Sequence, residues 1–375
     1  MMTQLGRRLA VAAALLALGM SAGSAANPVP KPAPKPATGD AAATGKSTAS
    51  AETPAAEAEK AVPRFQPPLD PTLGVPPPSA GLLPSPDELL RSGRGMDDDV
   101  GDPAFGAFQR GYYLTAFRYA MARAQAGDPI SKTLVARLYA EGLGVKQSIK
   151  AAAAWYQQAA LAGDPAAQMA MGILYLDGKG VKKDKAKAAD AFEQAAAWND
   201  PAAEYNLGLL YLEGEVRPRD SEKAAQLFSR SAGQGNIDAE YALAQMYSEG
   251  EGVVLDDGIA ALWLGKAAKA GHTDAQLEYG IRLYNGAGVP KDAVAAAGWF
   301  RRAAEAGNPV AQNRYARVLA IGMGVAPDPV AAAKWHMIAA KAGAKDGWLD
   351  DFVAKLSDAE RKSAQDQAQS WPAKG

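Results

Sequence analysis

The residues between 163 and 198 carry the pattern of hydrophobic and polar positions that organises most of this chain. Their apolar residues recur at intervals of four, three and one positions, which places them on one side of a helix: Ala167, Met171, Leu174 and Tyr175. Asp164 and Pro165 stand before this segment as an N-cap residue and a proline at the first helical position. Gly178 ends it, because glycine accepts the positive φ that commonly closes a helix. Asp184 then caps a second segment, so the stretch predicts two short helices joined by a glycine loop.

The same pattern returns every 36 residues. The glycine that closes the first helix recurs without a slip at Gly142, Gly178, Gly214, Gly250, Gly286 and Gly322. The N-cap position keeps step with it at Asp128, Asp164, Asp200, Asn236, His272 and Asn308. A fixed period of this length is typical of solenoids, in which each unit packs only against its neighbours. The copies over residues 127–342 therefore predict an all-α protein, a right-handed α/α superhelix built from six helix-turn-helix repeats.

The second helix of each repeat carries columns of its own. Small residues recur at Ala159, Ala195, Ser231, Ala267, Ala303 and Ala339, and large ones at Trp155, Trp263, Trp299 and Trp335. Small side chains let helices approach closely, and we expect the tryptophans to fill the space between them. The whole pattern resembles the Sel-1-like repeat family, which is related to the tetratricopeptide repeats. The resemblance implies an α/α superhelix that serves as a protein-binding scaffold, usually in assembly or in the control of signalling.

Residues 1–26 have the order of features found in a secretory signal peptide. Arg7 and Arg8 form a basic start, Leu9–Met20 an apolar stretch of twelve residues, and Ser24–Ala26 a cleavage site of small residues. This apolar stretch is shorter than the roughly 20 residues that span a bilayer. We expect cleavage and a periplasmic or secreted protein, with an uncleaved anchor as the alternative.

Residues 27–102 are expected to form a disordered linker. Fifteen of the 25 prolines fall in this part of the chain, which has no periodic apolar residues with which to form a core. Proline and lysine alternate from Pro28 to Pro36, a composition that favours the polyproline II conformation. The linker is a spacer or a docking segment for the cell wall or a partner. The three aspartates at 97–99 lack the alternating oxygen ligands of a calcium loop.

The two ends of the repeat array have sequences of their own. Residues 103–126 predict a shorter helical hairpin that caps the N-terminal end, because a solenoid must cover its first apolar face. Residues 343–375 predict C-terminal capping helices. Within them, Ser357 and Glu360 have the spacing of a capping box, which predicts a helix from residue 358 to about residue 370. The position of Trp371, folded back on the last repeat or free, stays open.

The third repeat departs most from the others. Trp198, Asn199 and Asp200 replace the usual Ala-Gly-Asp, and Val216 and Arg217 replace the second glycine and the valine of the loop. Neutral drift of the sequence accounts for these substitutions. The alternative is that the third repeat serves locally as a hinge or a binding site.

The sequence offers little of the chemistry that an enzyme needs. The chain has no cysteine, and its two histidines occupy repeat positions, His272 as an N-cap and His336 beside Trp335. The Gly-x-Gly loops are not completed by a Walker lysine. Lys plus Arg (40) balance Asp plus Glu (41), so no basic surface for nucleic acid is expected. We therefore expect no enzymatic activity, no cofactor or metal, and no nucleic-acid partner. Some disulfide-rich members of the resembling family bind or hydrolyse β-lactams, but the cysteine pairs that they carry are absent here.

A second stripe on the first helices is the candidate binding surface. In repeat proteins of this kind the first helix lines the concave side. The residue types of this stripe differ from one repeat to the next, whereas the neighbouring positions keep theirs. It comprises Tyr205, Leu209, Glu213, Tyr241, Gln245, Leu277, Ile281, Asn313 and Arg317. Large aromatic and aliphatic residues often anchor interfaces, although contact with the next repeat would explain them equally well. We expect a periplasmic adaptor for a protein partner such as an envelope sensor kinase or an assembly factor, with a cell-wall-associated structural protein as the alternative.

Overall fold

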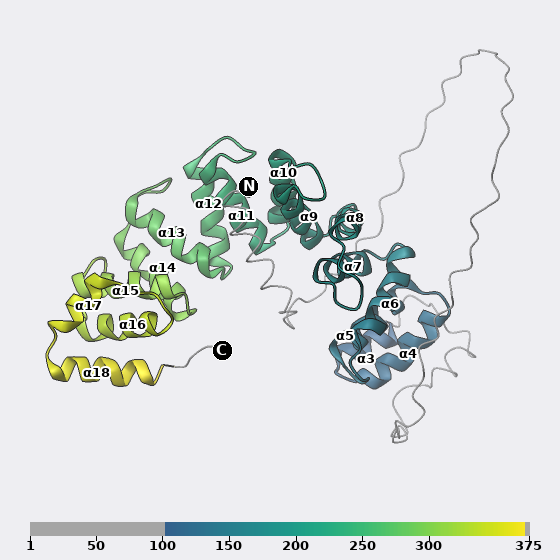
Figure 1. Ribbon diagram of the computed structural model, residues 1–375, viewed down its shortest axis with the longest axis horizontal. Helices are drawn as coiled ribbons and strands as arrows, with labels where there is room; N and C mark the ends of the chain where they lie inside the picture. The colour runs from purple at the N-terminus through teal and green to yellow at the C-terminus, as the bar shows by residue number, and fades with distance from the viewer. Residues whose placement is uncertain (1–101, 372–375) are drawn as a thin grey trace, which may run out of the picture. The chain divides into compact units, whose positions relative to one another are not determined.

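The structure is a computed structural model that describes residues 102–371 (Figure 1). This part of the chain contains sixteen α-helices and no strand. In order they are α3 (Pro103–Gln109), α4 (Tyr113–Gln125), α5 (Pro129–Glu141), α6 (Ile149–Leu161), α7 (Pro165–Asp177), α8 (Lys185–Ala196), α9 (Pro201–Glu213), α10 (Ser221–Gly233), α11 (Ile237–Glu249), α12 (Asp257–Lys269), α13 (Thr273–Asn285), α14 (Ala293–Glu305), α15 (Pro309–Ile321), α16 (Pro329–Lys341), α17 (Gly347–Ala354) and α18 (Asp358–Gln369). None of them combines the length and apolar character that a membrane span requires. The predicted signal peptide, the linker up to residue 101 and the aspartates at 97–99 lie outside the described residues.

The first helix of each repeat begins and ends as the sequence predicts. In α7 the Asp164 carboxylate accepts a hydrogen bond from the Ala167 amide at 2.7 Å, and Gly178 closes the helix at a φ of 73°. All six repeats have this cap bond. His272 makes it through Nδ1, which accepts from the Ala275 amide at 3.1 Å. The second helices are capped in the same way by Ser148, Asp184, Asp220, Asp256, Asp292 and Asp328.

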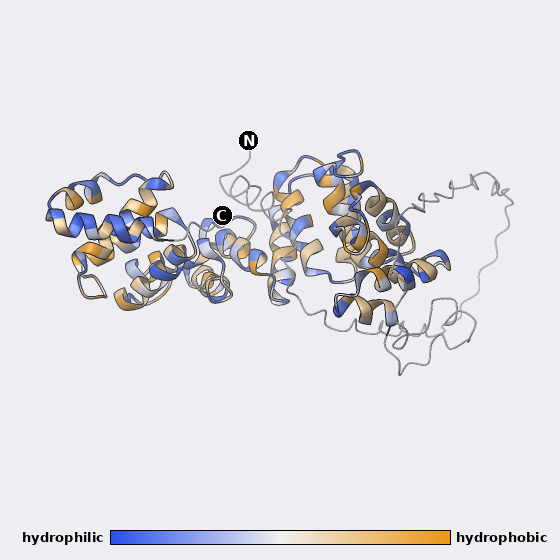
Figure 2. Cartoon of the chain, turned by 90° about the horizontal axis from the view of Figure 1, so that it is seen from below, coloured by the Kyte–Doolittle hydropathy of each residue, from blue (hydrophilic) through white to orange (hydrophobic). Residues whose placement is uncertain are grey.

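From α3 to α17 consecutive helices pack side by side, and α18 packs against α16. The small residues predicted for close helix approach are all fully buried: Ala159, Ala195, Ser231, Ala267, Ala303 and Ala339. Apolar and polar residues alternate along the helices, as expected where one side of each packs against its neighbours (Figure 2). The predicted α/α solenoid with a period of 36 residues is therefore confirmed.

The tryptophan column is only partly buried. Trp155 and Trp335 lie in the core, whereas Trp263 and Trp299 are partly exposed and each lies under a basic side chain three residues later in the helix. The deeper column is the next one along each second helix, where Phe192 and its equivalents pack. The tryptophans thus contribute less uniformly to the core than the repeat pattern predicts.

In the third repeat, other residues stand at two glycine positions of the pattern, and polar contacts hold the irregular loop. Asn199 adopts a φ of 59° where the other repeats have glycine, a conformation that asparagine tolerates better than most residues. In the irregular loop, Arg217 forms ion pairs with Asp190 at 2.6 Å and Glu193 at 3.5 Å. These contacts join the loop to α8 of the preceding repeat.

Additional helices stand at both ends of the repeats. The pair α3 and α4 precedes the first repeat, and Phe108 and Tyr113 pack there with their rings 5.7 Å apart. At the other end the predicted capping box of Ser357 and Glu360 is confirmed at the start of α18. Trp371 folds back on the last repeat, where its ring lies 4.8 Å from that of Trp335.

Candidate protein-binding site

The structure divides the predicted binding stripe into a buried and an accessible group. Five of its side chains lie inside the protein with 4–9% of their surface exposed: Tyr205, Tyr241, Gln245, Leu277 and Asn313. Burial raises the pKa of the Tyr205 phenol well above its ordinary value, and the nearby Asp238 carboxylate adds to this effect. The five side chains pack within the stack of repeats, so the prediction that they are presented to a partner is corrected.

The geometry of the stack explains this burial. The fifth residue of α11 contacts the N-cap residue of α13 in the next repeat, and the fifth residue of α15 contacts the segment that follows the last repeat. Asn313 donates a hydrogen bond to the Ala344 carbonyl at 3.0 Å, and the Tyr241 ring stacks on His272 at 4.3 Å. The Tyr241 hydroxyl also donates to Glu278 in that next repeat at 2.8 Å. This column therefore connects repeats, which is the alternative that the sequence left open.

The other four predicted residues retain accessible surface. Leu209, Glu213 and Ile281 are partly buried, and Arg317 is exposed. Glu213 is engaged with Lys185 of the preceding repeat. The surface formed by α5, α7, α9, α11, α13 and α15, here called the first-helix face, thus keeps part of the predicted stripe.

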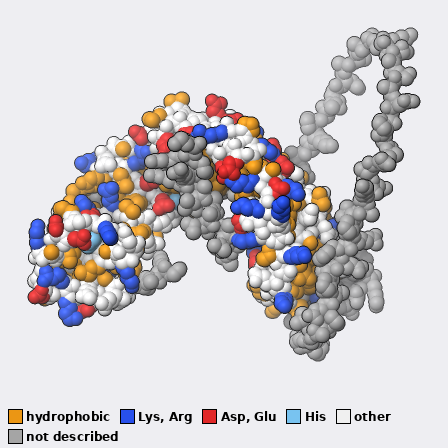
Figure 3. Space-filling view, in the orientation of Figure 1, with side chains coloured by type: hydrophobic (Ala, Val, Ile, Leu, Met, Phe, Trp, Pro, Cys, Tyr) orange, Lys and Arg blue, Asp and Glu red, His pale blue; other side chains and the backbone are white. Residues whose placement is uncertain are grey.

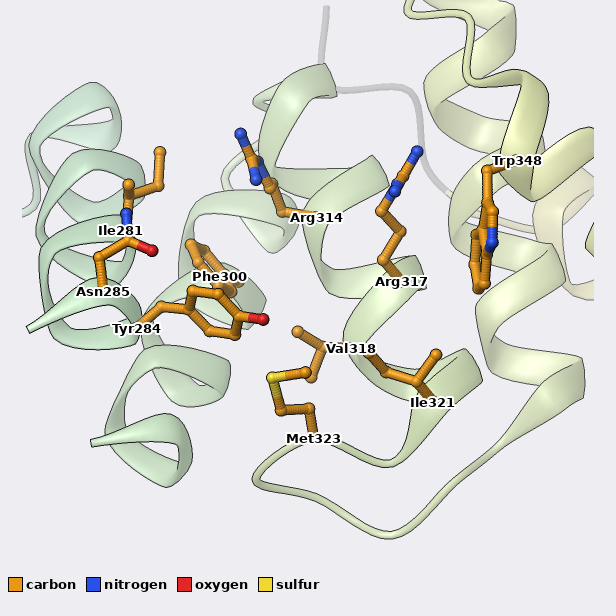
Figure 4. A pocket seen from close by; sticks show the side chains of 10 residues that line it. All are labelled: Ile281, Tyr284, Asn285, Phe300, Arg314, Arg317, Val318, Ile321, Met323 and Trp348. Atoms are coloured by element: carbon orange, nitrogen blue, oxygen red, sulfur yellow. The ribbon is translucent and has the colours of Figure 1, made fainter. Parts of the chain in front are cut away.

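Ile281 and Arg317 meet at a pocket of about 370 Å³, here called the groove pocket. Its walls come from α13, α14, α15, the loop after α15, and α17. Figure 4 shows Arg314 and Arg317 projecting from α15, with Trp348 of α17 beside Arg317 and residues of α13 on the opposite wall. The lining consists of Ile281, Tyr284, Asn285, Phe300, Arg314, Arg317, Val318, Ile321, Met323 and Trp348.

The charges at the groove pocket are unevenly compensated. Arg317 donates two hydrogen bonds to Asp346, both at 2.7 Å, and its guanidinium lies 5.2 Å from the Trp348 ring. These bonds hold the pKa of Asp346 below its ordinary value. Arg314 is exposed, and no ion pair joins it to any side chain within residues 102–371. The pocket therefore combines an apolar lining with one uncompensated positive charge.

Sequence reasoning missed most of this pocket, although one signal was present. The last residue of the first helix is acidic in the first four repeats and then changes character: Glu141, Asp177, Glu213, Glu249, Asn285 and Ile321. Loss of the acidic side chain in the fifth and sixth repeats makes room for apolar contact beside the arginines. Trp348 could not be found in this way, since it lies beyond the repeats.

The two histidines have structural roles, as the repeat positions predict. His272 caps α13, and burial lowers its pKa, against the opposing effect of the neighbouring Asp238. His336 is buried, with Nδ1 3.1 Å from Asn313 and Nε2 2.7 Å from Asp350. In this way His336 on α16 connects α15 and α17, both of which line the groove pocket.

Basic and acidic side chains are interspersed over the face seen in Figure 3, as the balanced composition predicts. The geometry defines a helical repeat solenoid with an accessible pocket on one face. The Sel1 repeat family profile matches residues 129–164, 165–197, 201–236, 237–272, 273–308 and 309–343, which is more than half of the chain. The chain belongs to the Sel1 repeat family. Its members are generally non-catalytic, and the fold is typical of scaffolds for protein–protein interaction.

Solved structures agree with this assignment. A protective antigen of uropathogenic Escherichia coli with an SLR fold is 29% identical, with a TM-score of 0.65. The match covers 76% of this chain and 64% of the antigen, so this chain spans slightly less than two thirds of that protein. A Sel1 repeat protein from Oxalobacter formigenes is 32% identical, with a TM-score of 0.58, over 64% of this chain and 98% of that one. A comparison with curated proteins gives no match.

Proposed function

We propose that this protein is a non-enzymatic scaffold that binds a protein partner through its first-helix face, with the groove pocket as the principal contact. The observation that supports this most directly is the pocket itself, in which accessible apolar side chains lie around Arg314, for which residues 102–371 provide no ion-pair partner. Buried aromatic or aliphatic anchors beside a charged group commonly dominate protein interfaces. The repeat family and its typical use as an interaction scaffold are consistent with this function.

The proposed place of action is the periplasm or the cell exterior. The N-terminal sequence supports export, because a basic start, an apolar stretch and small residues follow one another over residues 1–26. The proposed partner is accordingly an envelope protein, such as a sensor kinase or an assembly factor. The adaptor would hold this partner without modifying it.

Affinity capture from the envelope fraction tests this proposal. The wild-type protein is compared with a triple variant at the pocket, Ile281→Ala, Arg314→Ala and Trp348→Ala. The matched control carries three similar truncations at exposed positions outside the pocket lining: Leu161→Ala, Arg301→Ala and Val310→Ala. We expect one defined partner to bind the wild type and the control but not the pocket variant. Equal capture by all three would exclude the pocket as the contact, and failure of the wild type to retain any envelope protein would argue against the scaffold itself.

A cell-wall-associated role is the second candidate, favoured by the alternating proline and lysine residues from Pro28 to Pro36. Sedimentation with purified peptidoglycan distinguishes it from the adaptor. A wall protein would sediment as the full chain but not when it starts at Asp87, whereas an adaptor would remain in the supernatant in both forms.

A further inference from the structure

We propose that the groove pocket binds an acidic, apolar segment of a protein partner, with a large apolar side chain in the pocket and a carboxylate paired with Arg314. This inference rests on the proposed scaffold function and specifies the ligand chemistry of one site on it. It is carried by three features: a half-exposed apolar rim, an arginine that no other described side chain pairs with, and a lining that contains no acidic residue.

The apolar rim is formed by exposed side chains of two elements, α15 and α17, which lie on the side of the pocket away from α13 (Figure 4). Ile321 at the end of α15 is 51% exposed, and Trp348 on α17 is 43% exposed. Phe300, which also lines the pocket, is buried and lies beside Tyr284 on the α13 side (Figure 4). The volume of about 370 Å³ falls within the range of natural ligand pockets. A leucine, phenylalanine or tryptophan side chain that entered here would cover the exposed parts of Ile321 and Trp348.

The charge at this site selects a carboxylate. The other arginines of the first helices are paired, since Arg137, Arg282 and Arg317 each contact an acidic side chain at 2.7–2.8 Å. Arg314 is the exception and is solvent-exposed. Its planar guanidinium can hold a carboxylate through two parallel hydrogen bonds, the geometry that arginine favours. An acidic side chain on the partner would supply the negative charge that residues 102–371 do not place beside Arg314.

A peptide fits this arrangement better than a phosphate group or a nucleic acid. Arg317 shares its charge with Asp346 through two hydrogen bonds, so Arg314 is the one arginine of the pocket lining without an acidic partner among residues 102–371. One guanidinium beside an apolar pocket suits a singly charged carboxylate next to an apolar side chain. The site also belongs to the first-helix face between α13 and α15, where an amphipathic segment can lie along the helices.

Selection from a phage-displayed library of random dodecapeptides, with the full chain immobilised, tests this inference. The binding of the most enriched peptide is then measured by fluorescence anisotropy with two pocket variants, Arg314→Glu and Ile321→Glu. The second variant restores the acidic residue that the first four repeats carry at this position. Two controls make the same change outside the pocket, Arg301→Glu on α14 and Val310→Glu, which is 52% exposed on α15 itself.

The expected peptides combine a large apolar residue with aspartate or glutamate. Each pocket variant should weaken binding by about ten-fold or more, because Arg314→Glu removes a charged hydrogen bond and Ile321→Glu replaces an apolar contact with a negative charge. Both control variants should bind as the wild type does. Enriched peptides without acidic residues, or peptides whose binding the pocket variants leave unchanged, would overturn the inference. So would the absence of any enriched peptide, or a concentration-dependent dimer that Arg314→Glu abolishes, which would make a second copy of the chain the occupant. If variants with these same substitutions still captured an envelope partner, the scaffold function would stand, but the groove pocket would not be its binding site.

Discussion

The contact between Gly208 and Phe228 provides a direct test of how the two helices of a repeat are matched. Gly208 lies on α9 against the fully buried ring of Phe228 on α10. A Cβ added at Gly208 would lie 2.6 Å from the ring atom Cε1 and 3.0 Å from Cδ1, closer than carbon atoms can approach. The change Gly208→Ala is therefore expected to displace the phenylalanine ring.

The repeats themselves suggest the compensating substitution. Each glycine at this position is paired with phenylalanine, and each alanine with a different residue: Gly172 with Phe192, Gly208 with Phe228, Gly280 with Phe300, but Ala136 with Tyr156, Ala244 with Leu264 and Ala316 with His336. The fourth repeat thus accommodates alanine by using leucine. Phe228→Leu should open the space that the alanine methyl group requires.

The magnitudes follow from two opposing effects. Inserting a methyl group into a packed core costs about 1–3 kcal/mol, whereas alanine is favoured over glycine within a helix by about 1 kcal/mol. Gly208→Ala should therefore lower the free energy of unfolding by about 0–2 kcal/mol. Phe228→Leu alone should lower it by about 1 kcal/mol. The double variant should be closer to wild type than the two losses predict together, with a favourable coupling of about 1–2 kcal/mol.

Urea denaturation followed by far-ultraviolet circular dichroism measures these differences. The control is Gly298→Ala on α14, where no atom lies within 4 Å of the added Cβ. This variant should be about 1 kcal/mol more stable than wild type, because only helix propensity changes. The reasoning would be refuted if Gly208→Ala stabilised the protein as much as Gly298→Ala does, or if the double variant lost the sum of the two single losses.

Three further predictions concern buried and paired groups. Tyr241→Ala should destabilise the fold by about 3–5 kcal/mol, while Leu209→Ala should cost about 1 kcal/mol or less; equal urea midpoints for the two variants would contradict the inter-repeat role of the tyrosine. Burial raises the pKa of Tyr156 to about 12 from an ordinary value of 10.0, so the native protein keeps a proton that the unfolded chain releases, and stability should fall as the pH rises from 10 towards 12. Tyr156→Phe should make that fall shallower, and an unchanged pH profile would count against it. Asp346→Asn keeps the N-cap of α17 but removes the pair with Arg317, at a cost of about 1 kcal/mol or less. Because the pKa of Asp346 is lowered from 3.8, this difference should be fully present above that pH and disappear below it in acid denaturation, and a difference that persisted in acid would refute the assignment.

The sequence by itself determined the local structure of this protein. The cap residues and the closing glycines could be predicted because each acts within one helical turn of its own position. The capping box of Ser357 and Glu360 is of the same kind. The period of 36 residues then required every unit to stack on the next, so the solenoid could also be predicted without any knowledge of long-range contacts.

The tertiary structure alone decided which of the stripe residues a partner can reach. Tyr241 and Ile281 belong to the same variable stripe in sequence, yet one is buried against the next repeat and the other lines an open pocket. The pocket likewise depends on Arg314 and Trp348, which come from a repeat and from a helix beyond the repeats. A periodic pattern records the side of one helix on which a residue lies. It does not record what the neighbouring helix places against that side, and this placement separates a packing contact from a binding surface.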